Sequence, residues 1–278
     1  MRIARFTTGG EPRYGLVQAE GGRDYLAVVA GDPLFMKAMP TGERVPLPSD
    51  SYDDDGAAGS GVADSGEHVR LLAPVIPRSK VVGVGLNYLN HVKEMGHDHP
   101  SAPVLFLKPN TSVCGPDDPI ILPTWSDEVS YEVELAVVVG KIARNVREAD
   151  AHKYILGYTV ANDVTARDAQ RADGQWARAK GFDTACPLGP WIMTGFDPAS
   201  ARITSRVNGV TKQDSNISDM IFDVPHLLSY ISEAMTLLPG DVILTGTPAG
   251  VGPINAGDVV ECEIEGIGVL RNPVLRRD

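Results

Sequence analysis

The segment 130–141, SYEVELAVVVGK, places bulky β-favouring side chains at every second position. This period of two predicts a strand with one face in a core, and it puts Glu132 and Glu134 together on the opposite face. Two carboxylates at this spacing lie about 6 to 7 Å apart and repel each other unless a cation lies between them. The pattern therefore predicts either a divalent metal site or an edge strand whose outer face is solvated.

The composition narrows the class of protein. With 43% hydrophobic and 22% charged residues among 278, the chain is typical of a soluble globular protein and is long enough to bury a large core. Residues 50–67 contain six acids and no Lys or Arg, so more than half of the net charge of −11 comes from this segment. No basic run or stripe occurs elsewhere, which argues against a nucleic-acid partner.

The cysteines and the N-terminus indicate the compartment. Cys114, Cys186 and Cys262 lie far apart and form no CxxC pair, so neither a disulfide framework nor a zinc site is indicated. The first residues lack the apolar stretch of a signal peptide, and no run of about 18 apolar residues follows. We therefore expect a cytoplasmic protein with no membrane partner.

Three regions follow from the pattern of apolar runs. Residues 1–49 contain short strand-like runs between Gly, Pro and Glu turns, which predicts a small β-rich N-terminal domain. Residues 50–70 form an acidic Gly/Ser/Asp-rich loop or linker that cannot build a core. Residues 71–278 carry regularly spaced short apolar runs, which predicts a mainly β domain with a few short helices. The N-terminal strands are expected at 2–8, 14–18 and 24–29, later strands at 155–161 and 203–207 with two at the C-terminal end, and helices at 148–154 and 224–235.

A short helix is also expected after Gly85. Asn87 is placed as its N-cap, and His91 and Glu94 follow three residues apart, which puts them on one helical face. A Glu that accepts from one imidazole nitrogen orients the ring and raises the basicity of the other nitrogen. Alone, such a pair is also typical of a surface contact. We expect His97 and His99, in the following loop, to be solvated.

A metal held by Glu132 and Glu134 needs a third ligand, and Asp163 is the best candidate. It lies where the strand expected at 155–161 runs into a polar cluster, and sites on β scaffolds are built at strand ends. Three carboxylates suit Mg²⁺, Mn²⁺ or Ca²⁺ and leave about half of an octahedral shell open to water and a chelating oxyacid. Taken alone, Asp163 could instead be a turn or helix-cap residue.

Five motifs in series resemble the fumarylacetoacetate hydrolase family in their order and spacing, from about residue 71 to the C-terminus. They are VGVGLNYLNHVKEM, SYEVELAVVVGK, ANDVTARDAQ, QWARAKGFDTACPLGP and LTGTPAGVG. The resemblance implies a mixed β-roll catalytic domain, a homodimer, and one Mg²⁺ or Mn²⁺ per subunit bound by Glu132, Glu134 and Asp163. It also implies 2-oxo acid substrates, typically acylpyruvates or oxaloacetate.

The same resemblance implies the roles of the remaining site residues. Arg167, Gln170 and Lys180 would surround the substrate carboxylate and ketone, with Lys180 also acting in catalysis, because Arg and Lys are fixed positive donors. Thr247 would meet the substrate carboxylate through its hydroxyl and backbone. Taken singly, the charged residues are typical of a solvated surface, and the segment Gly-Thr-Pro around Thr247 is typical of a tight turn.

For His91 and Glu94, the resemblance implies a mobile lid that supplies the general base. A 2-oxo acid that chelates a cation through a carboxylate oxygen and its ketone oxygen would be stabilised as an enolate. We therefore expect a metal-dependent enzyme, with hydrolytic C–C cleavage of an acylpyruvate-like substrate favoured. The alternatives are an oxaloacetate decarboxylase, an isomerase or decarboxylase of 2-hydroxyhepta-2,4-diene-1,7-dioate-type intermediates of aromatic catabolism, and a metal-binding dimeric scaffold or sensor without turnover.

Overall fold

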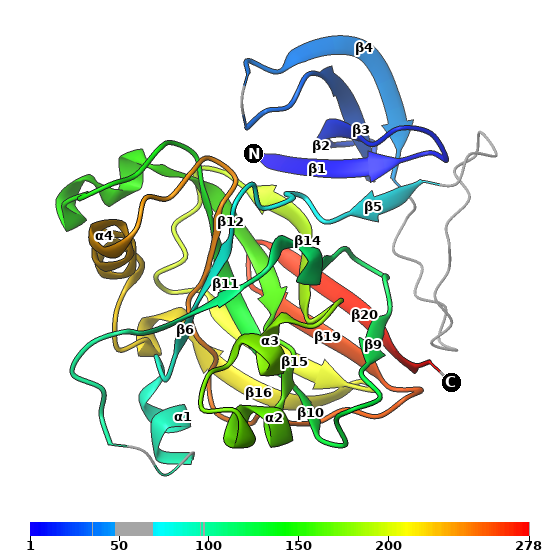
Figure 1. Ribbon diagram of the computed structural model, residues 1–278. Helices are drawn as coiled ribbons and strands as arrows, with labels where there is room; N and C mark the ends of the chain where they lie inside the picture. Colours follow the sequence, from blue (N-terminus) through cyan, green and yellow to red (C-terminus); the bar gives the residue numbers. More distant parts are fainter. Residues whose placement is uncertain (35, 48–68, 95, 97, 278) are drawn as a thin grey trace.

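The computed structural model describes residues 1–34, 36–47, 69–94, 96 and 98–277. The acidic loop expected at 50–70 lies almost entirely outside them. The described residues form a mainly β structure with several sheets and a few short helices, as expected (Figure 1). None of the helices among them is long and apolar enough to cross a bilayer.

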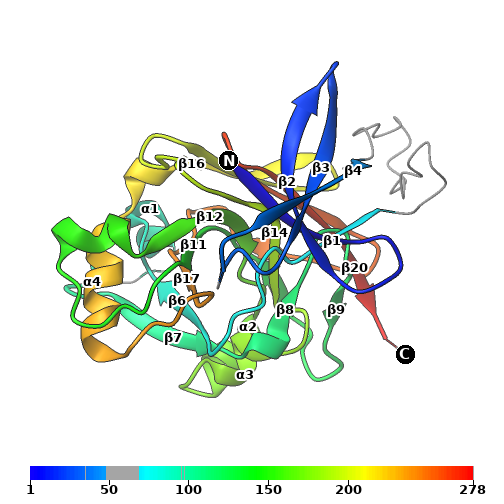
Figure 2. The ribbon, with the colours of Figure 1, turned by 90° about the horizontal axis from the view of Figure 1, so that it is seen from above.

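The largest sheet combines the N-terminal strands with strands from the middle of the chain, up to residue 244. Its neighbours in order are β4 (Met39–Pro46), β3 (Arg23–Ala30), β2 (Arg13–Glu20), β1 (Arg2–Thr7), β14 (Cys186–Met193), β12 (Ile155–Asn162), β11 (Val133–Val139), β17 (Val242–Leu244), β6 (Val81–Gly85) and β7 (Val104–Lys108), while β5 (Arg70–Leu72) pairs with β1 and β8 (Val113–Cys114) with β14. The strands expected in the N-terminal region are confirmed, and β4 is an addition to them. Because β1 pairs with β14, the N-terminal hairpins extend the sheet of the main body, from which they project in Figure 2.

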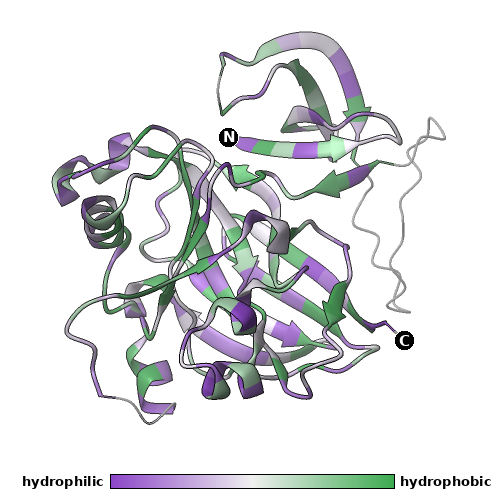
Figure 3. Ribbon diagram, in the orientation of Figure 1, coloured by the Kyte–Doolittle hydropathy of each residue, from purple (hydrophilic) through white to green (hydrophobic). Residues whose placement is uncertain are grey.

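Strand β11 lies inside this sheet, between β12 and β17. The expected alternation is present, since Val133, Leu135 and Val137 enter the main core. The opposite face is also buried, because Ala136 and Val138 belong to a second apolar cluster. The expected core face is therefore confirmed and the alternative of a solvated edge is wrong, and the charge of Glu134 on β11 lies in a low-dielectric interior. In Figure 3, β11 and β6 are coloured mostly hydrophobic.

Two smaller sheets complete the β structure. A five-stranded sheet is ordered β16 (Val210–Asn216), β15 (Arg202–Val207), β19 (Val259–Ile264), β20 (Gly268–Arg276) and β9 (Ile120–Leu122), and a three-stranded sheet is ordered β13 (Thr165–Ala166), β10 (Val129–Tyr131) and β18 (Gly252–Pro253). The strands expected at 203–207 and at the C-terminal end are confirmed. Ile203 and Val260 pack in the same core as the odd positions of β11, so the five-stranded sheet covers one face of that strand.

The helices are short. They are α1 (Leu89–Glu94), α2 (Arg167–Ala172), α3 (Ala177–Gly181) and α4 (Val224–Ala234), with 3₁₀ turns η1 (Asn110–Ser112), η2 (Glu148–Lys153) and η3 (Ile217–Asp219). The expected helix at 224–235 is confirmed as α4, where the Asp223 side chain caps the N-terminus by accepting from the His226 N–H. The helix expected at 148–154 is a 3₁₀ helix. Helices α2 and α3 are not expected from the sequence, because five or six residues are too short to show a helical period and neither helix has a side-chain cap.

The helix expected from Asn87 begins two residues later, at Leu89, so Asn87 is not its cap. The Asn87 side chain instead donates to Phe222 O at 3.0 Å and to Thr245 O at 2.7 Å, and accepts from the Phe222 N–H at 2.8 Å. It thus ties the start of α1 to two distant loops. His97 lies outside the described residues, and His99 is exposed as expected.

Candidate active site

Three carboxylates meet where β11 and β12 pair. Glu132 directly precedes β11, Glu134 is its second residue, and Asp163 directly follows β12. The antiparallel register pairs Val133 with Asn162, and the Asp163 N–H donates to Glu132 O at 2.8 Å. This pairing brings together carboxylates that are about thirty residues apart in the sequence. One oxygen from each carboxylate lies within 4.8 Å of the others, and all three side chains are buried. The structure thus brings the expected ligand set together.

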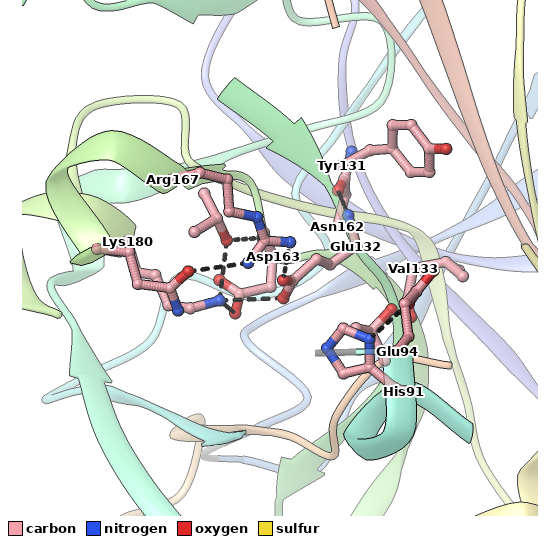
Figure 4. A network of polar contacts seen from close by, with 12 residues as sticks. His91, Glu94, Tyr131, Glu132, Val133, Asn162, Asp163, Arg167 and Lys180 are labelled. Atoms are coloured by element: carbon pink, nitrogen blue, oxygen red, sulfur yellow. Dashed lines mark hydrogen bonds and ion pairs between the residues drawn. The ribbon is translucent and has the colours of Figure 1, made fainter. Parts of the chain in front are cut away.

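Buried cations face these carboxylates, as Figure 4 shows. Arg167 Nη2 lies 2.5 Å from Glu132 Oε1, and Lys180 Nζ lies 3.0 Å from Glu132 Oε2 and 2.5 Å from Asp163 Oδ2. Lys108 pairs with the other Asp163 oxygen. Among the described residues, three buried cations therefore contact the cluster of three acids.

The three carboxylates differ in how well nearby cations neutralise their negative charge. Burial raises the pKa of Glu132, but Arg167 and Lys180 outweigh it and hold that pKa below its usual range. Burial, Asp163 and Glu132 all raise the pKa of Glu134, whose partner is the Gly246 N–H at 2.6 Å. Glu134 is thus the acid that a further cation would relieve most. Three clustered, buried carboxylates with this excess repulsion fit a hard divalent cation.

The carboxylates form one wall of a pocket of about 320 Å³. Eight of the nine site residues expected from the sequence line it, and Glu94 reaches it only through His91. The pocket lining is Val84, Gly85, Leu86, His91, Val104, Phe106, Glu132, Glu134, Asp163, Arg167, Gln170, Arg171, Trp176, Lys180 and Thr247. Helices α2 and α3 supply Arg167, Gln170 and Lys180, and Arg167 Nη1 donates to Gln170 Oε1 at 3.0 Å. Hence the pocket combines anionic, cationic and apolar surfaces.

The His91–Glu94 pair approaches the pocket from α1 (Figure 4). His91 is buried, and its Nδ1 lies 3.1 Å from Glu94 Oε2. The Glu94 carboxylate also accepts from the Gly250 N–H at 3.1 and 3.2 Å. With Glu94 accepting from Nδ1–H, the Nε2 atom of His91 is the nitrogen able to take a proton.

Thr247 lines the pocket, but its hydroxyl is already engaged. Thr247 Oγ1 donates to Val133 O at 2.9 Å and accepts from Gln213 Nε2 at 2.7 Å. A hydroxyl has one proton to donate, so that proton is directed into the protein. The expected contact between hydroxyl and substrate is therefore not prepared here.

Lys108 and Asn162 lie at the site and are not expected there from the sequence. Lys108 ends an apolar run, VLFLK, and a lysine in such a position usually lies at the solvated end of a strand. In the structure its side chain has no exposure. It donates to Ala185 O at 2.7 Å and forms an ion pair with Asp163. Asn162 Oδ1 accepts from the Glu132 N–H at 2.9 Å, and its Nδ2 is buried without a hydrogen-bond partner among the described residues. For Asn162, the sequence feature that could have indicated a role at the site is its position directly before Asp163.

Sequence profiles of known families cover nearly the whole chain. The profile "Fumarylacetoacetate (FAA) hydrolase C-terminal" matches residues 80–275. The chain belongs to the fumarylacetoacetate hydrolase family. A second profile, "Rv2993c-like, N-terminal", matches residues 1–74. Members of the fumarylacetoacetate hydrolase family are hydrolases, isomerases or decarboxylases of 2-oxo acids, and this chain is an enzyme of that family.

Three relatives show the range of reactions within the family. "Oxaloacetate tautomerase fahd2, mitochondrial" from Xenopus laevis is 40% identical over 295 residues, which cover 99% of this chain and 90% of the relative. The structure of 2-hydroxyhepta-2,4-diene-1,7-dioate isomerase from Mycobacterium marinum has 45% identity and a TM-score of 0.85, covering 100% of this chain and 99% of that one. Fumarylpyruvate hydrolase from Pseudomonas aeruginosa, solved with Mn²⁺ and pyruvate, has 33% identity and a TM-score of 0.70, covering 73% and 91%.

Proposed function

We propose that this enzyme moves a proton on a 2-oxo acid, with Mg²⁺ or Mn²⁺ held by Glu132, Glu134 and Asp163, and that its reaction is keto–enol tautomerisation of a substrate such as oxaloacetate. The observation that carries this proposal is the position of His91, whose ring lines the same pocket as the three carboxylates. A proton acceptor and a place for a hard cation thus face one cavity of the size of a small substrate.

The chain's own residues divide the work. A bound divalent cation supplies a Lewis acid that stabilises charge developing on the substrate ketone oxygen. Arg167 and Lys180 line the pocket as donors for the substrate carboxylate. His91 Nε2 takes the proton from the carbon beside the ketone and returns a proton to complete the tautomer, while Glu94 stabilises the imidazolium that forms in between.

The charge of the site favours a dicarboxylate. Three buried acids and three buried cations cancel, so a bound divalent cation would leave an excess of two positive charges. A substrate with two carboxylates, such as oxaloacetate, matches that excess. The relative that aligns over 99% of this chain is named an oxaloacetate tautomerase, which supports the same choice.

Hydrolytic cleavage of an acylpyruvate, which sequence analysis favours, is the second candidate. The same His91–Glu94 pair could activate water, and the fumarylpyruvate hydrolase neighbour supports this reaction. The hydrolase neighbours, one of which covers 100% of the chain, are 33% and 36% identical to it, whereas the tautomerase and isomerase relatives are 40% and 45% identical. We therefore favour tautomerisation.

The test is turnover of enol oxaloacetate, acetylpyruvate and fumarylpyruvate with Mn²⁺, with Mg²⁺ and with EDTA. We expect cation-dependent decay of the enol that EDTA abolishes and added Mn²⁺ restores. The variant His91→Gln should lose about 10²- to 10⁴-fold in kcat while keeping Mn²⁺ affinity. The exposed His99→Gln serves as its control and should match the wild type.

Each result assigns a reaction. Pyruvate release from either acylpyruvate, without faster enol decay, would replace tautomerisation by hydrolysis. Loss of carbon dioxide from oxaloacetate would indicate a decarboxylase. Tight binding of Mn²⁺ and oxalate without turnover of any compound would support the alternative of a metal-binding scaffold or sensor without catalytic activity.

A further inference from the structure

Gln213 is a fully buried side chain that reaches the site from another sheet. It lies on β16 in the five-stranded sheet, and all its hydrogen-bonding positions are used. Its Oε1 accepts from the Val133 N–H at 3.0 Å and from the Ser205 hydroxyl at 2.9 Å. Its Nε2 donates to Thr247 Oγ1 and to Pro248 O, both at 2.7 Å. Because Val133 N–H can only donate and Pro248 O can only accept, the partners fix which way the amide faces.

The two ends of the amide hold two parts of the pocket. Val133 lies between Glu132 and Glu134. The hydrogen bond from its N–H to Gln213 Oε1 therefore fixes the backbone between two of the proposed metal ligands. The Nε2 end fixes the loop that carries Thr247, next to Gly246, whose N–H donates to Glu134. Gln213 therefore bridges the carboxylate wall and the Thr247 loop, beside the direct hydrogen bonds from Gly246 to Glu134 and from Thr247 to Val133.

This arrangement decides which donor Thr247 can offer. Its hydroxyl proton goes to Val133 O, and its oxygen accepts from Gln213. Its main-chain N–H makes no hydrogen bond to any described residue. We propose that Gln213 is a positioning residue for the substrate carboxylate, holding Thr247 so that its main-chain N–H, and not its hydroxyl, is presented to the substrate. The inference rests on the proposed function and deepens it.

A purely structural role for Gln213 makes a different prediction. A satisfied buried amide stabilises any fold, and its loss would lower stability without a selective effect on ligand affinity. A positioning role lowers affinity for a carboxylate ligand beyond what lost stability explains. Residues that orient a site's contacting groups typically change affinity or activity by 10- to 100-fold when they are replaced.

The experiment measures two affinities in Gln213→Met, Mn²⁺ by calorimetry and oxalate in the Mn²⁺-loaded protein. We expect the oxalate Kd to rise by about 10-fold or more. Ser205→Ala is the matched control, because it removes one partner of Gln213 and leaves the contacts to Val133 and Thr247. Ser232→Ala, a buried hydroxyl on α4 that accepts from the Val146 N–H, controls for lost stability. Unchanged oxalate affinity in Gln213→Met, or an equal loss in Ser232→Ala, overturns the proposal.

The double variant with Thr247→Val tests the route of the effect. If Gln213 acts by holding Thr247, the oxalate losses of Gln213→Met and Thr247→Val are not additive. Additive losses would mean that the hydroxyl meets the ligand by itself, and would overturn the proposal. Should Gln213→Met not fold, Gln213→Glu replaces it, because a carboxyl keeps the acceptor for Val133 but at most one of the two donated bonds. This variant should weaken oxalate binding and keep Mn²⁺ binding.

The same measurements distinguish a failure of the proposed function from a failure of the positioning role of Gln213. A wild-type protein that binds neither Mn²⁺ nor oxalate overturns the proposed function and the positioning role with it. A wild-type protein that binds both, together with a Gln213 variant that binds both equally well, overturns the positioning role alone.

Discussion

Asp163 is held by two lysines that lie in different surroundings. Lys180 lines the pocket and divides its hydrogen bonds among Glu132, Asp163 and Thr165. Lys108 is absent from the pocket lining and has no side-chain exposure, and the polar partners of its ammonium among the described residues are Asp163 and Ala185 O. One lysine is thus available to a substrate, while the other permanently balances the Asp163 charge. Removing Lys108 would leave Asp163 with Lys180 alone, which is shared with Glu132, so the buried negative charge would lose part of its compensation.

We expect Lys108→Met to lower the free energy of unfolding by about 3–5 kcal/mol, because Asp163 loses a buried counter-charge. Urea denaturation followed by fluorescence measures this loss. Lys153→Met is the matched control, since Lys153 is more than half exposed and pairs with Asp150 at the surface; its effect should be small. Similar losses in the two variants would contradict the anchoring role of Lys108.

Some residues of the candidate site can be predicted from the sequence and others cannot. Glu132 and Glu134 follow from the period of two in one strand, and Asp163 from its place at a strand end. Arg167, Gln170 and Lys180 could be found only through family resemblance, because α2 and α3 are too short to show a period. Lys108 and Gln213 have polar identities that usually indicate solvent. Their burial results from pairing between segments far apart in the chain, which local sequence does not encode.

At the scale of elements, Asp241 joins the strands that carry two sides of the pocket. It directly precedes β17 and accepts from the N–H groups of Ser79, Lys80 and Leu238 at 3.0, 3.2 and 2.9 Å. The Lys80 ammonium adds an ion pair at 2.8 Å. Strand β6, which begins beside these residues, leads to α1, and β17 leads to the Thr247 loop. The Asp241 carboxylate therefore fixes the parallel start of both strands.

The stability contributed by Asp241 should depend on pH. Burial raises the pKa of Asp241, but Lys80 and the N–H donors outweigh it, so the folded-state pKa is below the usual value. A depressed pKa means that the contribution is present above pH about 4 and is lost as pH falls through the folded-state pKa. We expect Asp241→Asn to cost about 1.5–3 kcal/mol at pH 7, as for hydrogen bonds to a charged group.

Urea denaturation of Asp241→Asn and the wild type at pH 7 and at pH values below 4 measures this dependence. The difference between the two proteins should shrink as pH falls, because the protonated wild-type carboxyl no longer pairs with Lys80. A difference that stays constant across this range would show that the negative charge of Asp241 does not contribute.

At the scale of the whole molecule, the two edges of the large sheet differ. Edge strand β4 has the polar sequence MPTGERVP, with prolines that blunt pairing. Edge strand β7 has the sequence VLFLK and exposes Val104 and Leu107. An apolar edge is a surface that associates with other chains, which is consistent with the homodimer implied by the family resemblance.

We propose that the protein is a homodimer in solution. Light scattering coupled to size-exclusion chromatography should give twice the chain mass of 29.7 kDa. The measurement is made at several concentrations, because a dimer that dissociates on dilution would show a falling mass. A mass of one chain at the highest concentration would contradict the homodimer.

The pairing of β1 with β14 also has a consequence in time. Arg2 pairs with Met193, so β1 leaves the ribosome about 190 residues before its partner strand β14. At roughly 5–20 residues per second, β1 waits roughly 10 to 40 s for β14 to be synthesised. During that interval the hairpins β1–β2 and β2–β3 can form and β5 can pair with the end of β1, but Arg2 and Ile3, which later receive β14, have no partner on that side. The nascent chain therefore carries a short open strand edge at the start of β1 until β14 is made, and an unpaired edge of this kind can associate with other chains.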